Sequence, residues 1–338
     1  LLCARWAIEY GYSSFEAGLT VFGREVANES EALSAIYPYA AAGAAAGVTL
    51  GTVFGLIYLL IMHKVKGDKI TKTELANAPR PEKSGVIAKN LIKFAIPVAL
   101  SSLVFSITNL IDSITVQNRL EFMVAENLDF IRNLYSTELV GILDADIKDF
   151  LYGAYSLSID FRNLIPSITM TLGISAIPAL SAAWAVKNKH DIRVSIESVM
   201  RVTMLVAMPC GIGMGVLAQP ILAVFYGNGE SASGVSIAAP VLTVYGFTIF
   251  LMALSQPMTN MLQALGKTKV PLVSLTIGAL AKLVANFIFV AIPELNVNGA
   301  VIGTVLCYVI VVTINLIALI RTARVRINFF SVFLKPIF

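Results

Sequence analysis

Seven apolar stretches in this chain are each long enough to cross a lipid bilayer. They lie at about residues 37–62, 91–116, 151–184, 199–225, 237–264, 271–292 and 299–320. A helix needs about 20 mostly apolar residues to span the hydrocarbon core, and it satisfies its backbone polar groups from within one segment. The sequence therefore predicts an all-α, polytopic membrane helical bundle with about seven full transmembrane helices.

The composition of the chain supports a membrane location. Of its 338 residues, 57% are apolar and 14% carry charge, and the mean hydropathy is +0.78. An average soluble domain is about 45–50% apolar and about 25% charged. This composition excludes an ordinary cytosolic enzyme, a disordered protein and a nucleic-acid-binding module.

The connections between the spans alternate in charge. Seventeen Lys and Arg residues lie in one set of connections and five in the other, whereas the acidic residues divide five to fourteen in the opposite sense. The basic set comprises loop 63–90 with Lys93, loops 187–201 and 265–270, and segment 321–326. Because cytoplasmic loops carry the excess of Lys and Arg, loop 63–90 is predicted to be cytoplasmic, and all seven spans then alternate in direction.

No motif for catalysis or metal binding is found in the sequence. The two histidines, His63 and His190, lie in basic loops, and the three cysteines, Cys3, Cys210 and Cys307, are far apart. No nucleophile elbow, P-loop or zinc-protease motif is present, and no His, Cys or Asp cluster has metal-ligand spacing. We therefore expect no catalytic residue, no metal and no cofactor.

Four ionisable residues fall within the spans: Asp112, Asp160, Arg162 and Lys282. Each costs about 2.5–3.5 kcal/mol at the centre of a membrane helix on insertion scales. Such residues mark either a functional, water-lined site or a structural ion pair, and both readings stay open because two acids balance two bases.

Uncharged polar residues also recur within the spans at helical spacing. Asn286 follows Lys282 by four residues, so both share one helix face. Further stripes are Gln256, Asn260 and Gln263 on the fifth span, and Thr304, Tyr308 and Asn315 on the seventh. Each stripe alone is typical of hydrogen bonding between helices. Together with the charges, they predict an interior polar cavity.

Several motifs resemble those of one transporter family. They include Asn109-Leu110-Ile111-Asp112, Asn163-Leu164-Ile165-Pro166, Leu262-Gln263-Ala264-Leu265-Gly266-Lys267 and the runs 95–98, 118–120, 177–181, 277–284 and 298–304. Over about residues 37–325 the chain is similar to the stage V sporulation protein B group of lipid II flippase-like polysaccharide-biosynthesis proteins. That group belongs to the multidrug/oligosaccharidyl-lipid/polysaccharide (MOP) exporter superfamily, which has a two-lobed, MATE-like fold.

The resemblance implies a domain organisation. Residues 1–36 would be the end of a preceding helix plus an external segment, 37–62 the last helix of the first lobe, 63–90 a cytoplasmic inter-lobe linker, 91–325 the second-lobe helices with an external insert at 117–150, and 326–338 the start of a further membrane segment. From its residues, segment 121–150 of this insert is predicted to form a short acidic amphipathic helix or two. Because the first residue is Leu and an apolar run reaches the last, we expect a piece of a longer protein.

The resemblance also implies a substrate site. Arg162 matches an arginine that faces the central cavity of lipid II flippases, where it would meet the substrate pyrophosphate. A guanidinium fork suits that group. Asp160, Asn163, Gln256 and Asn260 are the further candidates for substrate binding.

Some relatives bind sodium at positions that here hold Asp112, Lys282, Asn286 and Thr304. Because Lys282 replaces an oxygen ligand, we predict instead an internal ion pair between Lys282 and Asp112, and transport without sodium. One objection is geometric: at about 1.5 Å per residue, Asp112 is expected about 10 Å nearer the outer face than Lys282. Asp160 is then the competing partner.

These expectations define a function. The protein would be a flippase or exporter of a lipid-linked (polyprenyl-pyrophosphate) oligosaccharide or peptidoglycan precursor, working by alternating access in the bacterial cytoplasmic (inner) membrane. Its partners would be that substrate and membrane lipids, with cell-envelope synthesis proteins as a further candidate class and no nucleic acid. The alternatives are a multidrug or other solute antiporter of the same fold and a non-transporting membrane scaffold.

The charge asymmetry gives a test of orientation. We expect a cysteine placed at Lys72 to react with a membrane-impermeant thiol reagent only from the cytoplasm, and one placed at Ser136 only from outside, because positive charge marks the cytoplasmic side. Labelling of intact cells and inverted vesicles measures this, and the parent chain gives the background of the native cysteines. The reverse pattern would contradict both the orientation and the family resemblance.

Overall fold

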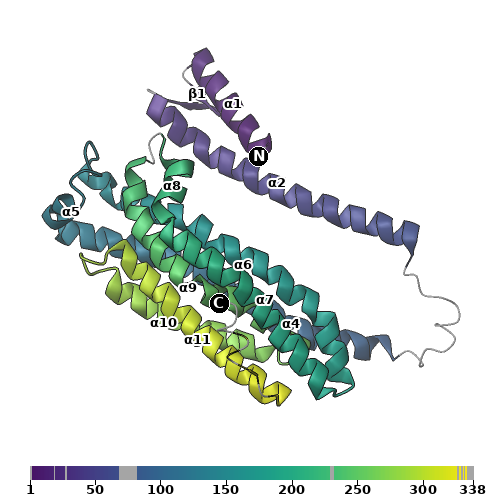
Figure 1. Cartoon of the computed structure of the whole chain (residues 1–338). Helices are drawn as coiled ribbons and strands as arrows, with labels where there is room; N and C mark the ends of the chain where they lie inside the picture. The colour runs from purple at the N-terminus through teal and green to yellow at the C-terminus, as the bar shows by residue number, and fades with distance from the viewer. Residues whose placement is uncertain are drawn as a thin grey trace. The chain divides into compact units, whose positions relative to one another are not determined.

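A computed structural model of the chain describes residues 2–18, 20–26, 29–67, 82–228, 232–325, 327, 328, 330 and 332. Within these residues the fold is all-α apart from one short hairpin (Figure 1). Seven helices are long and apolar enough to cross a membrane, and each overlaps one of the seven predicted spans. The prediction of an all-α membrane bundle is confirmed.

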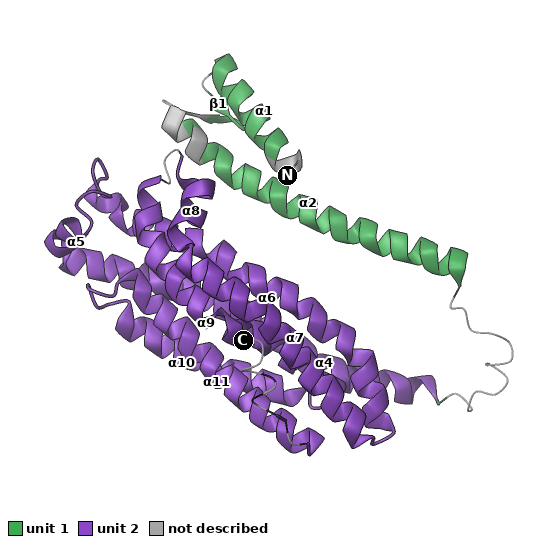
Figure 2. Cartoon of the chain, viewed as in Figure 1, with its two compact units in different colours: residues 1–82 green, residues 83–338 purple. Residues whose placement is uncertain are grey.

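The chain divides into two compact units, residues 1–82 and 83–338 (Figure 2). The boundary falls inside the predicted linker 63–90. One helix reaches Lys66 and the next begins at Ser84, so the described ends of this linker are largely helical. Residues 68–81 of the linker lie outside the described part of the chain, as does most of the predicted further segment 326–338.

In the first unit a hairpin joins two helices. The elements are α1 (Leu2–Gly18), β1 (Thr20–Val21), β2 (Arg24–Glu25) and α2 (Glu29–Lys66). The strands pair antiparallel, and the turn residues Phe22 and Gly23 have φ of 48° and 84°, as a type I′ turn requires at both central positions. The sequence analysis predicted no strand here, because a pair of two-residue strands is too short to show an alternating pattern.

The second unit is a bundle of long helices with short elements between some of them. In chain order they are α4 (Ser84–Glu126), α5 (Leu128–Leu134), η1 (Asp144–Asp146), α6 (Ile147–Ala185), α7 (Lys189–Val216), α8 (Ala218–Tyr226), η2 (Ala232–Gly234), α9 (Val235–Ala264), α10 (Lys269–Phe289) and α11 (Val297–Ala323). Helix α5 and the turn η1 lie within the predicted external insert 117–150.

The fourth predicted span, 199–225, is wrong in its extent. The helix breaks at Leu217 into α7 and α8. Pro220 has no N–H to bond the carbonyl of Val216, and the glycines Gly213 and Gly215 lower the helix propensity of the last turn. The apolar run therefore holds one long helix and one short helix.

The second predicted span, 91–116, is also too short. Helix α4 continues for ten further residues to Glu126, with Val116, Leu120 and Met123 buried at helical spacing. This three-and-four periodicity continues a helix even though polar residues interrupt the apolar run. Asp112 therefore lies well inside α4 rather than near its end.

Helix α9 is the central element of the second unit. It packs against α6, α7, α8 and α11, whereas α10 packs against α4 and α11. One buried apolar cluster, which includes Met200 and Leu262, lies toward the basic connections. Another, which includes Leu120 and Val297, lies toward the acidic ones. Polar side chains from α4, α6, α9 and α10 meet beside this second cluster, to which Tyr155 and Tyr245 belong.

Three glycines let the backbones of α7 and α9 approach closely. A Cβ atom added to Gly246 on α9 would lie 2.4 Å from the backbone nitrogen of Gly215 and 2.7 Å from the carbonyl oxygen of Gly211. Neither contact can be relieved by turning a side chain. Small residues are the usual device for such close helix crossings in membranes.

We expect Gly246→Ala to destabilise the second unit by about 1–3 kcal/mol, the typical cost of overpacking, because the added methyl group forces α7 and α9 apart. Thermal unfolding of the detergent-purified protein measures the loss. Gly213→Ala is the matched control, since nothing lies within 4 Å of a Cβ at that position. Equal stability of the two variants would contradict the close crossing.

Candidate functional site

The site is built around one buried carboxylate, that of Asp112 on α4. Lys282 Nζ lies 3.0 Å from its Oδ2 atom, and Asn286 Nδ2 donates to its Oδ1 atom at 2.9 Å. All three side chains are buried. The structure thus places the two predicted ion-pair partners in contact, whereas their role in transport stays a prediction.

The local sequence explains why both α10 side chains reach Asp112. Lys282 and Asn286 are four residues apart and occupy one face of α10. Gly303 on α11 makes room behind them: a Cβ atom there would lie 2.1 Å from Asn286 Oδ1. The absent side chain of Gly303 therefore lets Asn286 point its amide nitrogen at Asp112.

The expected 10 Å offset between Asp112 and Lys282 is not found. That estimate placed the outer end of the second span near residue 116, but α4 continues to Glu126. The carboxylate therefore lies deeper relative to the helix end, at the level of Lys282. Asp160, the competing partner, is exposed.

Arg162 on α6 approaches the same carboxylate oxygen as Lys282. Its Nη1 atom lies 4.0 Å from Asp112 Oδ2 and donates to the Tyr245 hydroxyl at 3.1 Å. The Tyr155 hydroxyl donates to Asp112 Oδ2 at 3.3 Å and lies 3.1 Å from the Tyr245 hydroxyl. Four helices, α4, α6, α9 and α10, thus meet in one hydrogen-bonded network.

The network has an excess of positive charge. One buried carboxylate lies beside two buried cations, at 3.0 Å from Lys282 and 4.0 Å from Arg162. Buried ions are stable only when they are paired and hydrogen-bonded. Arg162 is the less satisfied cation, because its Nε atom has no hydrogen-bond partner among the described residues.

Two adjoining cavities lie in the second unit, and Arg162 lines one of them. One cavity has a volume of about 280 Å³ and is lined by Arg162, Asn163 and Gln256. Its lining also includes Phe105, Asn109 and Tyr308. A cavity of about 250 Å³ continues along α4 and α9 and is lined by Gln256, Asn260 and Gln263, among others. Phe105, Met170 and Gln256 line both cavities.

Four of the five predicted substrate residues line these cavities: Arg162, Asn163, Gln256 and Asn260. The Asn260 amide nitrogen is buried without a hydrogen-bond partner among the described residues. Asp160 points elsewhere, since it is exposed while Arg162, two residues later, is buried. A two-residue step on a helix turns a side chain to a different face.

Thr304, the fourth predicted ion-coupling residue, does not contact the carboxylate. Its hydroxyl donates to the Ala300 carbonyl of its own helix at 3.0 Å. Together with Arg162, Lys282 and Tyr308 it lines a small cavity of about 10 Å³, which is close to the lower limit for one water molecule.

The two tyrosines, Tyr155 and Tyr245, were missed by the sequence analysis. Both are fully buried and connect Asp112 with Arg162. The sequence signal for them was a phenol hydroxyl within an apolar span. This signal does not single out a buried site, because tyrosine is also common at membrane–water interfaces. Their role comes from contacts between residues 43 and 90 positions apart.

The donor set around Asp112 does not suit a bound cation. Lysine is a hydrogen-bond donor with no free lone pair when charged, and its ammonium group occupies the position beside the carboxylate. Among the described residues, no group of three or more His, Cys, Asp or Glu side chains could hold a metal ion.

Comparison with known proteins gives one family match. The sequence model of the family described as "Lipid II flippase MurJ" matches residues 164–335, just over half of the chain. The chain is 28% identical over 147 residues to the lipid II flippase MurJ of Bacillus subtilis, which covers 43% of this chain and 26% of that protein. It is 27% identical over 152 residues to the stage V sporulation protein B of the same organism, and this match covers 45% of this chain and 28% of that protein.

One solved structure is also similar. It is a MOP superfamily transporter from Pyrococcus furiosus, with a TM-score of 0.46 and 15% identity, covering 70% of this chain and 46% of that one. The matched region spans about a quarter of the length of the two Bacillus relatives.

The charge count of the network predicts unequal effects of two substitutions. Asp112→Asn leaves Lys282 and Arg162 buried without their carboxylate and should destabilise the protein by about 3–5 kcal/mol. Lys282→Met should cost less, because the carboxylate keeps Arg162 nearby and the cluster becomes neutral. Thermal unfolding measures both, and Asp160→Asn, which removes an exposed carboxylate from α6, serves as the control. Equal losses for the two buried variants would show that Asp112 is not shared.

Proposed function

The chain belongs to the lipid II flippase MurJ family, and from this premise we propose that it moves a lipid-linked saccharide bearing a pyrophosphate group across the membrane. Its seven apolar helices and its family make it a multi-pass protein of the bacterial cytoplasmic membrane. The substrate class proposed is a polyprenyl-pyrophosphate oligosaccharide or peptidoglycan precursor.

The observation that carries the proposal is the position of Arg162. It is buried, it lines the larger of the two adjoining cavities, and its nearest carboxylate is already held by Lys282 at 3.0 Å. A guanidinium in this setting keeps donors available for a second anion. Phosphate groups are recognised by such a planar fork, often through two parallel hydrogen bonds.

The rest of the cavity lining fits a saccharide carrier. Asn163, Gln256 and Asn260 each offer both a donor and an acceptor, as sugar hydroxyls and phosphate oxygens require. Carboxylates are absent from the described lining of the two cavities, which favours an anionic substrate over a cationic drug.

Lys282 supplies the positive charge that a coupling ion would otherwise bring. Because its ammonium group pairs with Asp112, the carboxylate is neutralised without an added cation, and the charge of Arg162 is left for the substrate. Binding of the pyrophosphate would compete with Asp112 for Arg162. Such a difference in contacts between the empty and loaded site is what a ligand needs to shift a conformational equilibrium.

The proposal includes the class of protein and its partners. A flippase carries out transport, and we propose that this chain catalyses no covalent reaction. Membrane lipids and the lipid-linked substrate are its proposed partners, and cell-envelope synthesis proteins are a further candidate class.

We expect Arg162→Ala to lower flipping of a pyrophosphate-linked saccharide in proteoliposomes. Loss of charged hydrogen bonds worth about 1.5–3 kcal/mol should lower the flipping rate about ten- to a hundredfold. Arg162→Lys should rescue poorly, because a point charge lacks the fork. Arg119→Ala is the matched control: Arg119 stacks on Phe122 and Phe287 at 4.6 and 4.1 Å, away from the cavities. Full activity of Arg162→Ala in a folded protein would show a structural role, as expected of the antiporter or scaffold alternatives.

The same assay tests the role assigned to Lys282. Replacing external and internal sodium with choline should leave flipping unchanged, because the ammonium group already neutralises Asp112. Dependence of transport on sodium would remove this part of the proposal and leave the pyrophosphate assignment to Arg162 intact.

A further inference from the structure

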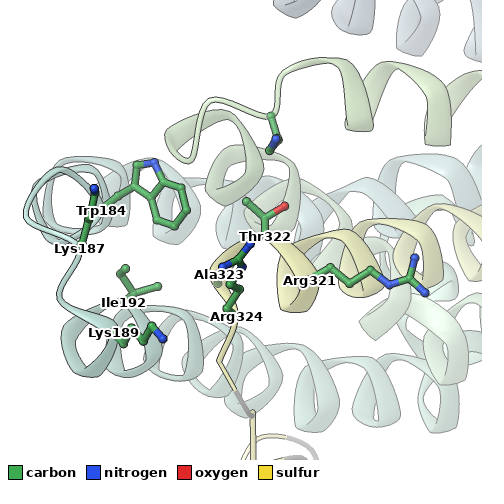
Figure 3. Close-up of a pocket in the computed structure, with 9 residues that line it drawn as sticks. Trp184, Lys187, Lys189, Ile192, Arg321, Thr322, Ala323 and Arg324 are labelled. Atoms are coloured by element: carbon green, nitrogen blue, oxygen red, sulfur yellow. The ribbon is translucent and has the colours of Figure 1, made fainter.

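A further cavity in the same unit is larger than the cavities around Arg162, Gln256 and Lys282 and shares no lining residue with them. It has a volume of about 550 Å³ and lies where the α6–α7 connection, the α9–α10 connection and the end of α11 meet (Figure 3). Five cations line it: Lys187, Lys189, Lys267, Arg321 and Arg324. By the distribution of Lys and Arg along the chain, this end of the unit faces the cytoplasm.

Backbone geometry places two of the lysines. Helix α6 ends with hydrogen bonds from Lys187 N to Trp184 O at 3.1 Å and from Asn188 N to Ala183 O at 3.0 Å. Lys187 has a φ of 55°, so this end is a Schellman motif with lysine at the left-handed position that usually holds glycine.

Helix α9 ends in the same way. Lys267 N bonds Leu262 O at 2.8 Å, and Gly266, with a φ of 75°, takes the left-handed position. Arg324, at the end of α11, is also left-handed, with a φ of 52°. Backbone hydrogen bonds within each helix thus hold the three helix ends, which carry Lys187, Lys267 and Arg324.

The cations lack counter-charges within the described chain. No described carboxylate lies within 4.0 Å of a charged nitrogen of any of the five. Two acids on α7 have other partners: Asp191 accepts from the Asn188 amide at 2.6 Å, and Glu197 pairs with Arg193 at 2.9 Å. A cavity lined by charges of one sign concentrates ions of the other sign.

We propose that this cavity binds a phosphate-bearing anion at the cytoplasmic face. A multiply charged phosphate or pyrophosphate group fits both the cation count and the donor chemistry of lysine and arginine. The same chemistry is available from a soluble anion and from the headgroup of an anionic lipid in the cytoplasmic leaflet, where such lipids attract basic segments. This site is independent of Arg162, and its binding can be measured without transport.

The chain offers its own reporter of occupancy. It has two tryptophans, and one of them, Trp184, lines the cavity (Figure 3). In a Trp6→Phe background, Trp184 is therefore the sole tryptophan of this 338-residue chain. Its emission reports on the cavity directly.

The first arm uses inorganic pyrophosphate and the detergent-purified chain. We expect saturable binding by calorimetry with a parallel change in Trp184 emission. Lys189→Gln with Lys267→Gln should weaken binding by about tenfold or more, the loss of one charged hydrogen bond. Lys89→Gln with Lys93→Gln on α4 removes the same charge from exposed positions outside the cavity and should leave binding unchanged. Absent binding, or equal weakening by both pairs of substitutions, would overturn the proposal.

The second arm distinguishes the sources of the anion. The chain is reconstituted in vesicles of phosphatidylcholine and of phosphatidylcholine mixed equally with phosphatidylglycerol. If a lipid headgroup occupies the cavity, phosphatidylglycerol alone changes Trp184 emission and lowers the affinity for pyrophosphate, and neither effect survives in Lys189→Gln with Lys267→Gln. If only pyrophosphate acts, the ligand is a soluble anion. A cavity that responds to neither probe does not bind phosphate. None of these results depends on whether the protein flips a lipid.

Discussion

A single buried carboxylate organises the second unit. Asp112 accepts from Asn286 and pairs with Lys282 on α10, accepts from Tyr155 on α6, and lies 4.0 Å from Arg162. In an apolar surrounding an ion must find partners within the protein, because the membrane provides none. The relative depth and rotation of α4, α6 and α10 are therefore tied to one side chain, and α9 joins through the Tyr245 hydroxyl.

Positive charge differs in kind between the network around Asp112 and the cavity beside Trp184. Beside Asp112 both cations are buried, and there is one more cation than carboxylate. Lys282 lies closer to the carboxylate, so the surplus positive charge is that of the Arg162 guanidinium. Around the cavity beside Trp184 the five cations are exposed and have no described carboxylate within 4.0 Å. A buried surplus favours one anion at one fixed position, whereas an exposed cluster attracts anions from a distance and is screened by salt.

Much of the fold could be predicted from local sequence. A membrane helix needs only enough apolar length and its own backbone hydrogen bonds, both of which lie within one segment. Hydropathy was therefore sufficient to predict the seven long helices of the described residues. Charge counts predicted a direction for each span, and that direction stays a prediction. Arg162, Asp112 and Lys282 stood out for the same reason, since an ionisable residue in an apolar span is costly wherever it points. The hairpin at Phe22–Gly23 and the break at Leu217 were missed because each depends on one or two residues.

The costly residues within the spans are thus evident from the amino-acid sequence, but which of them contact one another depends on how the helices pack. Asp112 and Lys282 are 170 positions apart, and their contact depends on how far α4 extends and on the room that Gly303 leaves on α11. The exposure of Asp160 beside the buried Arg162, the inclusion of Tyr155 and Tyr245, and the gathering of three helix ends around Trp184 have the same origin. Helix periodicity gives the face of a residue within its own helix, but partners across helices are set by packing, which fixes depth and rotation only when the whole bundle is assembled.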